Sequence, residues 1–217
     1  MHGEWTAQVQ EFAIMARRTQ DFNAFKLFRY AFTTTTTADG AAWIGSHTTL
    51  NGGTTNNQIT AADAGAATSA LTTSSYNVAI RRLAEMKSQA GVPLQCVGDT
   101  LVVPPALYVT ARQIAVSSLT PENGNNSANI FTVDYSVKVY QSVWLGTASG
   151  DGGSDTAWFV LDSKRHAIRR FVRQGIVTSL RDWTFSDDRT YRFQANFREE
   201  CYVPDYVGSV GALGTSA

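Results

Sequence analysis

Three histidines, His2, His47 and His166, are the side chains of this 217-residue chain best suited to proton transfer near neutral pH. Ser46 precedes His47 directly, and a hydroxyl beside an imidazole is the pair with which hydrolases attack a carbonyl carbon. Neighbours in sequence make a poor nucleophile–base pair unless the fold aims both at one point. The chain has no GxSxG, GxGxxG, P-loop or HExxH motif. The sequence therefore predicts a protein that is not an enzyme, with no catalytic residue and no cofactor.

Metal binding is the second chemistry that the residue types suggest. The segment "GDGGSD" at 150–155 has the acids and glycines of a Ca²⁺ loop, but no glutamate follows at ligand spacing. Asp187 and Asp188 fit a solvated turn or a cap better than an acid–base dyad. Cys96 and Cys201 lie in apolar runs outside any CxxC or His/Cys cluster, which argues against zinc. We expect no metal and two buried free thiols, with a disulfide as the alternative.

A basic stretch between residues 164 and 173 is the one concentration of charge. It could bind nucleic acid, but few aromatic rings accompany it and acidic residues follow downstream. We expect an exposed strand face, or charge pairing across a subunit boundary. The stretch consists of Lys164, Arg165, Arg169, Arg170 and Arg173.

The composition supports a buried core and gives no overall charge. Hydrophobic residues make up 43% of the chain and charged residues 17%, with 18 basic side chains balancing 18 acidic ones. Such a chain has no net field to attract DNA or an anionic membrane, and its low charge would make a poorly soluble monomer. Large protein–protein contacts would relieve that problem. The start "MHGEWTAQ" is no signal peptide, and no apolar run reaches the roughly 20 residues of a membrane span, so we expect a soluble protein made in a cytoplasm.

The elements that would position these residues begin with a long helix over 4–32. Its apolar residues recur at three- and four-residue steps without Pro or Gly, and a continuous helix would be about 40 Å long. Arg17, Arg18 and Arg29 lie off the apolar stripe and predict a solvated face or charge pairing with a neighbouring subunit. A polar connection over 33–60 follows, containing a possible short strand at "AAWIGS".

Two helices and two strands are predicted next. Thr60 and Asp63 resemble a capping box that opens a helix to about Leu71. A second helix has Ser74 or Ser75 as its N-cap and Gly91 just beyond its last turn. Strands are predicted at "PLQCV" and at "TLVV". In "VVPPALYVTAR" the two prolines make a strand-to-helix switch, because proline restricts the residue before it to extended geometry and is tolerated in a first helical turn.

The second half predicts mostly antiparallel strands. Residues 131–139 alternate apolar and polar, 146–155 form a flexible hairpin-like loop, and "TAWFVLD" is a central strand. Residues 167–185 are expected to form two or three short strands. "RTYRFQANFREECYV" alternates a side of Phe193 and Phe197 with a polar side. Helices followed by strands predict an α+β fold.

The order of these segments resembles a known family. "FKLFRYAF", "DG…W…SHT", "DTLVVPPALYVTARQIAVSS", "ENGNNSANIF" and "DTAWFVLDS" precede a final "RTYRFQANFREECYVPDY". Together they are similar to the major head (capsid) proteins of tailed bacteriophages, specifically the Mu-like major head subunit group, which have the HK97-type fold. The resemblance covers about residues 4–207.

The resemblance implies an HK97-like capsid fold with a spine helix, a mixed A-domain sheet flanked by helices, and antiparallel P-domain strands. Residues 1–35 would be the P-domain spine helix, 36–60 a connecting loop and 61–160 the A-domain. Residues 161–207 would be the A-domain return strands and the P-domain strands, and 208–217 a flexible tail. The family has an N-terminal arm and an E-loop before the spine helix, whereas Met1 lies almost at the start of that helix here. We expect that region to be absent, removed, or replaced by a segment such as 33–60.

The function implied by the resemblance is a shell subunit. It would self-assemble into pentamers and hexamers of an icosahedral head that encloses double-stranded DNA. The protein would be found in the virion after assembly in the host cytoplasm, without contact with a membrane. Portal, scaffold and decoration proteins are implied partners, and packaged DNA would be bound without sequence specificity. The predicted inter-subunit contacts are Trp5, Arg17, Arg18, Arg29, Asn125, Asn126, Arg169, Arg170 and Arg173.

Two alternatives remain on the sequence alone. One is an encapsulin-like nanocompartment shell that encloses a protein cargo. The other, from a different class, is a small hydrolase or a glycan-binding domain with a concave polar site.

Overall fold

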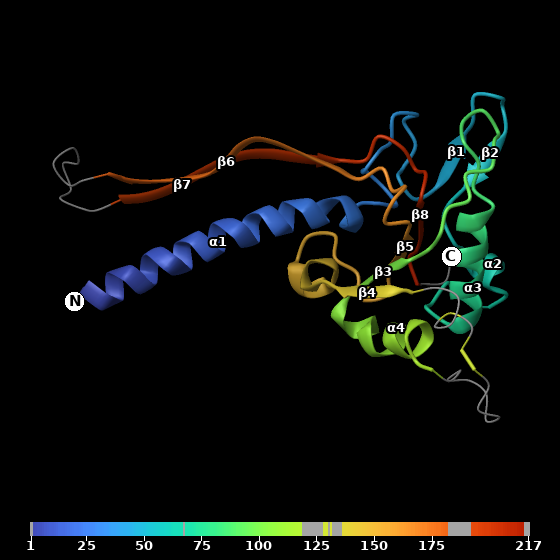
Figure 1. Cartoon of the computed structure of the whole chain (residues 1–217), viewed down its shortest axis with the longest axis horizontal. Coiled ribbons are helices and arrows are strands. Elements are labelled where there is room, and N and C mark those ends of the chain that lie inside the picture. Colours follow the sequence, from blue (N-terminus) through green and yellow to red (C-terminus); the bar gives the residue numbers. More distant parts are fainter. Residues whose placement is uncertain are drawn as a thin grey trace. The chain divides into compact units, whose positions relative to one another are not determined.

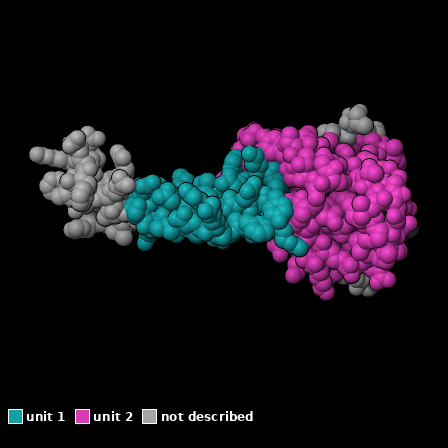
Figure 2. All heavy atoms as spheres, turned by 90° about the horizontal axis from the view of Figure 1, so that it is seen from above, with its two compact units in different colours: residues 1–27, 169–202 teal, residues 28–168, 203–217 magenta. Residues whose placement is uncertain are grey.

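A computed structural model describes residues 2–66, 68–118, 128–129, 131, 136–181 and 192–214 (Figure 1). The chain forms two compact units, each built from two separate stretches of sequence (Figure 2). Unit 1 contains residues 1–27 and 169–202, and unit 2 contains residues 28–168 and 203–217. Among the described residues, no helix is both long and apolar enough to cross a membrane.

Unit 1 consists of one helix along a two-stranded ribbon. Helix α1 runs from His2 to Arg29, which confirms the predicted long helix, and its residues up to 27 belong to this unit. Strands β6 (Arg169–Arg181) and β7 (Arg192–Tyr202) pair antiparallel (Figure 1). The prediction of two or three short strands over 167–185 was wrong, because shifts of register absorb the irregularity near Gly175 without ending β6.

Unit 2 has a four-stranded mixed sheet in the order β4-β3-β5-β8. The strands are β3 (Thr100–Val103), β4 (Lys138–Gln141), β5 (Trp158–Leu161) and β8 (Ser209–Ala212). β3 pairs parallel with β4 and antiparallel with β5, and β5 pairs antiparallel with β8.

Strand β8 corrects the expectation that residues 208–217 form a flexible tail. All four of its residues are buried. Its small residues suit a position among large rings: Gly211 pairs with Phe159, and a Cβ added at Gly211 would lie 2.9 Å from that ring. The small and polar residues of "GSVGALG" give no strand pattern in the sequence. The strand is stabilised by its neighbours in the sheet rather than by its own hydrophobicity.

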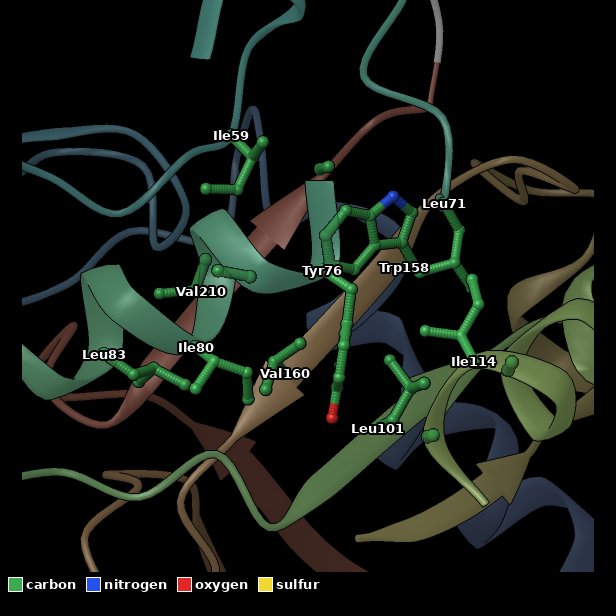
Figure 3. Close-up of a cluster of buried hydrophobic side chains, with 14 of the residues drawn as sticks. Ile59, Leu71, Tyr76, Ile80, Leu83, Leu101, Ile114, Trp158, Val160 and Val210 are labelled. Carbon is green, nitrogen blue, oxygen red and sulfur yellow. The ribbon is translucent and has the colours of Figure 1, made fainter. Parts of the chain in front are cut away.

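The main core lies on one face of this sheet (Figure 3). Helix α3 (Thr73–Ala84) directs Tyr76, Ile80 and Leu83 toward the sheet residues Leu101 and Val160, and the rings and branched chains fill the space between them. The opposite face carries an aromatic cluster in which Phe28, Phe32 and Trp43 surround Phe159, with ring centroids 5.2–6.2 Å from it. The sheet is therefore covered on both faces, which explains why β3 and β5 are buried throughout.

The helices before β3 are shorter than predicted. The capping box of Thr60 and Asp63 is confirmed, but α2 (Ala61–Ala64) ends at Gly65, which adopts a left-handed conformation. Helix α3 begins two or three residues earlier than expected, because Thr72 rather than Ser74 or Ser75 is its N-cap. It ends at Ala84, so Gly91 is not its C-terminal residue but part of a turn with φ +82°.

The two prolines act as predicted. β3 ends at Val103, Pro104 stays extended, and Pro105 opens the 3₁₀ turn η1 (Pro105–Leu107), which leads directly into α4 (Tyr108–Ala115). The predicted strand at "PLQCV" does not form, because Gln95 takes a positive φ of 50° that breaks extended geometry. Two further 3₁₀ turns, η2 (Val143–Leu145) and η3 (Thr147–Ser149), follow β4.

The segment 33–60 is more than a polar connection. It contains the hairpin of β1 (Ser46–Thr48) and β2 (Thr54–Asn56), so the short strand lies just after "AAWI" rather than within it. Trp43 and Ile44 are buried, and the Trp43 indole nitrogen donates a 2.8 Å hydrogen bond to the Ser209 hydroxyl. Of the alternating segment 131–139, residues 132–135 lie outside the described part of the chain.

Candidate subunit interface

The helix-facing side of the ribbon in unit 1 contains a polar cluster. Glu199 Oε2 accepts a 3.0 Å hydrogen bond from Gln20 Nε2 of α1 and bonds of 3.0 and 2.5 Å from Nε and Nη2 of Arg170. The hydrogen bond and charge of Glu199 raise the pKa of Arg170 above its usual range. The Glu199 side chain is only 2% exposed, whereas that of Arg170 is 42% exposed. This cluster joins helix and ribbon inside one subunit.

The opposite side of the ribbon faces solvent. In an antiparallel pair, directly opposed residues share a face, so Phe171, which pairs with Glu200, lies on the side away from α1. Phe171 is 57% and Tyr202 41% exposed, and their rings stack with centroids 5.3 Å apart. Val177, which pairs with the exposed Asn196, is 51% exposed on the same side. Three large apolar side chains therefore lie uncovered on this side of the strand pair, and Val172, which pairs with Glu199 on the other side, is also 54% exposed.

Helix α1 also exposes apolar side chains. Phe12, Ile14 and Met15 are 37%, 51% and 59% exposed, although Ala16 on the same turns is buried. A helix that leaves Ile and Met in water on its outer side has more apolar surface than its own subunit covers. Unit 1 thus presents uncovered apolar groups both on its helix and on its ribbon.

The structure divides the predicted contact residues into three groups. Arg17 and Arg18 are exposed on α1, and Arg169, Arg170 and Arg173 are exposed along β6. Arg29 is buried in unit 2, where Nη1 donates to the Trp144 carbonyl oxygen at 3.3 Å, so its guanidinium serves the interior of the subunit. Its burial also lowers its pKa, against the opposing charges of Asp151 and Tyr30.

The structure does not test the predictions for the remaining residues. Trp5 lies in α1, but its side chain is outside what the structure describes, as are Asn125, Asn126, Asp187 and Asp188 altogether. Sequence reasoning chose arginines, two asparagines and Trp5, and it overlooked Phe171, Val177 and Tyr202. One signal was available in the alternation of the last strand. Tyr202 falls on the same side as Arg198 and Glu200, where a fully solvated face would carry only polar residues.

His47, one of the residues considered for acid–base chemistry, has a structural role. His47 is fully buried, with Nδ1 2.8 Å from Asp39 Oδ2 and Nε2 3.2 Å from the Trp43 carbonyl oxygen. Its ring stacks on Tyr206 at 4.1 Å. The hydroxyl of Ser46, which lies next in the strand β1, is therefore not opposed by a free imidazole nitrogen.

Asp155 and the two cysteines, which were considered as metal ligands, can be placed in the structure. In "GDGGSD", Asp155 accepts hydrogen bonds from the backbone and hydroxyl of Thr147, which lowers its pKa and fixes the turn. No group of three or more potential metal ligands occurs among the described residues. Cys96 and Cys201 are free thiols whose pKa is raised mainly by burial, and Cys201 is only half-buried rather than buried as predicted.

A groove in unit 2 offers little for a hydrolase. Glu85 is the one carboxylate among its described lining residues, and these include no serine, histidine or cysteine. They are Thr54, Thr55, Arg82, Glu85, Met86, Lys87 and Pro93.

A comparison with curated proteins gives no match. A family model described as phage capsid protein matches residues 1–206, which is nearly the whole chain. The match includes both stretches of unit 1 and most of unit 2. The chain therefore belongs to the phage capsid protein family, whose members are structural subunits that assemble with other capsid subunits in the virion.

Proposed function

We propose that this chain is an HK97-type major capsid subunit of the Mu-like group, forming the pentamers and hexamers of an icosahedral head around double-stranded DNA. The observation that carries the proposal is the family match over 1–206 together with a helix-and-ribbon unit that leaves apolar side chains uncovered. In the proposed assignment α1 is the spine helix, β6 and β7 are the P-domain strands, and the mixed sheet belongs to the A-domain.

The charges suit a container more than a DNA-binding protein. The chain carries no net charge, so DNA would be held by confinement, with non-specific contacts from a few arginines on the inner side. Portal, scaffold and decoration proteins are the proposed further partners, and assembly would take place in the host cytoplasm. Arg17, Arg18, Arg169 and Arg173 are proposed as inter-subunit contacts, because all four are exposed.

Electron microscopy of particles purified from expressing cells tests the proposal. Closed icosahedral shells built from capsomers are expected. In particles from infected cells, the content should be nuclease-protected DNA, with an absorbance ratio typical of nucleic acid. Shells filled with protein would contradict the viral head and favour a nanocompartment. A chain that stays monomeric at high concentration would contradict any shell.

A Phe12→Asp variant adds a test of the spine-helix assignment. Phe12 is 37% exposed on α1, so a charge there meets either the ribbon or a neighbour. We expect loss of particles or of folding, and wild-type particle yield would contradict the assignment.

A further inference from the structure

The outer ribbon face, defined as Phe171, Val177, Arg198, Glu200 and Tyr202, leaves three large apolar side chains of unit 1 uncovered. Register places all five on the side of the ribbon away from α1. Phe171 pairs with Glu200, Val177 pairs with Asn196 two residues before Arg198, and Tyr202 follows two residues after Glu200. The five residues come from two successive strands, and the pairing of those strands brings them onto one face.

The apolar part of this face is already arranged for contact. The Phe171 and Tyr202 rings stack at 5.3 Å, so their side chains lose little further freedom when a partner covers them. Aromatic side chains with part of their area exposed are the groups that contribute most to binding in protein interfaces. A two-stranded ribbon is marginally stable alone, and α1 covers only one of its sides. Covering the other side would therefore stabilise both the ribbon and the assembly.

The charges on the face indicate the kind of partner. Arg198 and Glu200 stand two residues apart, both are exposed, and neither forms an ion pair with any described residue. Arg169 pairs with Tyr202 and adds a further basic side chain on this side, so the surface carries both signs and is not the purely basic surface that DNA or an anionic membrane needs. A protein surface that carries both signs beside apolar groups is complementary to it.

A second copy of this chain supplies such a surface. The exposed residues of α1 include Ile14 and Met15 beside Glu11 and Arg18, and the outer ribbon face itself carries both signs around aromatic rings. The family assembles with other capsid subunits, so copies of the chain are the partners present at high concentration. We propose that the outer ribbon face packs against a second copy of the chain and is buried when subunits assemble. This inference rests on the proposed shell function and adds to it the surface through which subunits meet.

Protection from a thiol reagent tests burial directly. A Phe171→Cys chain in a Cys201→Ser background would be assembled as a minority with wild-type chains, so that the substitution does not limit assembly. Purified chain alone is used, which leaves a second copy as the sole available partner. Maleimide should label the residue-171 thiol rapidly in unassembled subunits and at least several-fold more slowly in particles. Equal labelling in both states would overturn the inference. The reverse order, with particles labelled faster, would also overturn it.

Assembly of full variants provides the second test. Phe171→Ser with Tyr202→Ser should raise the subunit concentration needed for assembly about tenfold, because truncating aromatic interface anchors typically costs more than 1 kcal/mol. The matched control is Val109→Ser, which removes a 65% exposed apolar side chain from α4 in unit 2. The helical content and melting temperature of unassembled subunits should stay unchanged in both variants.

The outcomes separate this inference from the proposed function. Wild-type shells with an unaffected double variant would contradict the ribbon contact alone. Equal defects in the double variant and in Val109→Ser would contradict a specific role for the ribbon. A wild-type chain that forms no shell under any condition would contradict the proposed function and the ribbon contact together.

Discussion

Gln20 of α1 donates a 3.0 Å hydrogen bond to Glu199 of β7, joining residues that are 179 positions apart in the chain. Both side chains are buried, and Glu199 also holds Arg170 of β6. One carboxylate oxygen therefore links all three elements of unit 1. Few apolar side chains among the described residues of this unit are fully buried, so we expect a polar link of this kind to help hold its elements together.

Replacing Glu199 should loosen unit 1 selectively. Glu199→Ala leaves the Gln20 amide buried without its acceptor, a change that typically costs about 1–3 kcal/mol. Glu200→Ala is the matched control, because its side chain is exposed on the other side of the same strand and should change stability by no more than about 0.5 kcal/mol. Hydrogen exchange of α1 and β7 amides in unassembled subunits measures the difference. Equal protection in the two variants would contradict a structural role for Glu199.

Asn57 should be intolerant of a carboxylate. Its Nδ2 donates to the carbonyl oxygens of Trp43 and Ser209 at 2.9 and 3.1 Å, and its Oδ1 accepts from the Gly45 amide at 2.8 Å. Asn57→Asp replaces that donor with an acceptor that faces two carbonyls in a fully buried place, so we expect a loss of about 3 kcal/mol or more. Urea unfolding of the purified chain measures it.

The neighbouring residue provides the control for that prediction. Asn56 is exposed and its Oδ1 accepts a 2.9 Å bond from the Gln58 amide, which a carboxylate can equally accept. Asn56→Asp should therefore leave the unfolding midpoint nearly unchanged. Similar losses at both positions would show that the buried amide is not the cause.

Gly208 should be required for its lack of a side chain. It has a φ of +72°, and an added Cβ would lie 2.8 Å from the backbone of both Arg165 and His166. Gly40 has a similar φ of +78° but open space around it. Gly40→Ala should cost about 1 kcal/mol of backbone strain, whereas Gly208→Ala should cost clearly more because backbone atoms must move. Thermal unfolding compares them, and equal shifts would contradict the close approach.

Asp63 should make the free energy of unfolding depend on pH in the acid range. Burial acts to raise its pKa, but hydrogen bonds from Thr60 and Arg82 outweigh burial and hold the pKa below its usual value of 3.8. A lowered folded pKa means that the unfolded chain binds the proton more tightly. The stabilisation is therefore complete above the unfolded pKa and is lost as the pH falls through the folded value.

Unfolding measured between about pH 6 and pH 2 tests this dependence. Asp63→Asn should fall less steeply with acid than wild type, since it has no carboxylate to protonate. Arg82→Gln should also flatten the curve, because it removes one of the groups that lower the pKa. Curves for the variants that run parallel to wild type would contradict the assignment.

Local signals in the sequence were enough for several elements. The 28-residue helix α1 follows from apolar periodicity with one weak place at Thr19, and the capping box at Thr60 and the switch at Pro104 follow from the chemistry of single residues. Strand β7 shows its alternation plainly. In each of these cases the determining interaction lies within a few residues of the signal.

Features determined by distant contacts were missed. β8 is a strand because Phe159 and Trp158 cover its small residues, and β6 continues past Gly175 because β7 pairs with it on both sides of the irregularity. Arg29 was expected on the surface, but tertiary structure buries it beside Trp144. The alternation of β7 placed Tyr202 on the polar side of that strand, but only the register of two strands brings Phe171 and Tyr202 together, so the sequence did not predict the ring pair.

The position of β8 in the sheet also affects biosynthesis. Until Ser209–Ala212 has left the ribosome, β5 lacks its outer neighbour and Trp43 lacks the Ser209 hydroxyl that its indole binds. Nascent chains shorter than this would expose the rings of Trp158 and Phe159, whereas full-length chains hide them. Competence to assemble would therefore wait until this strand is in place, and a polypeptide that lacks it would be offered to chaperones and proteases before it could enter a growing shell.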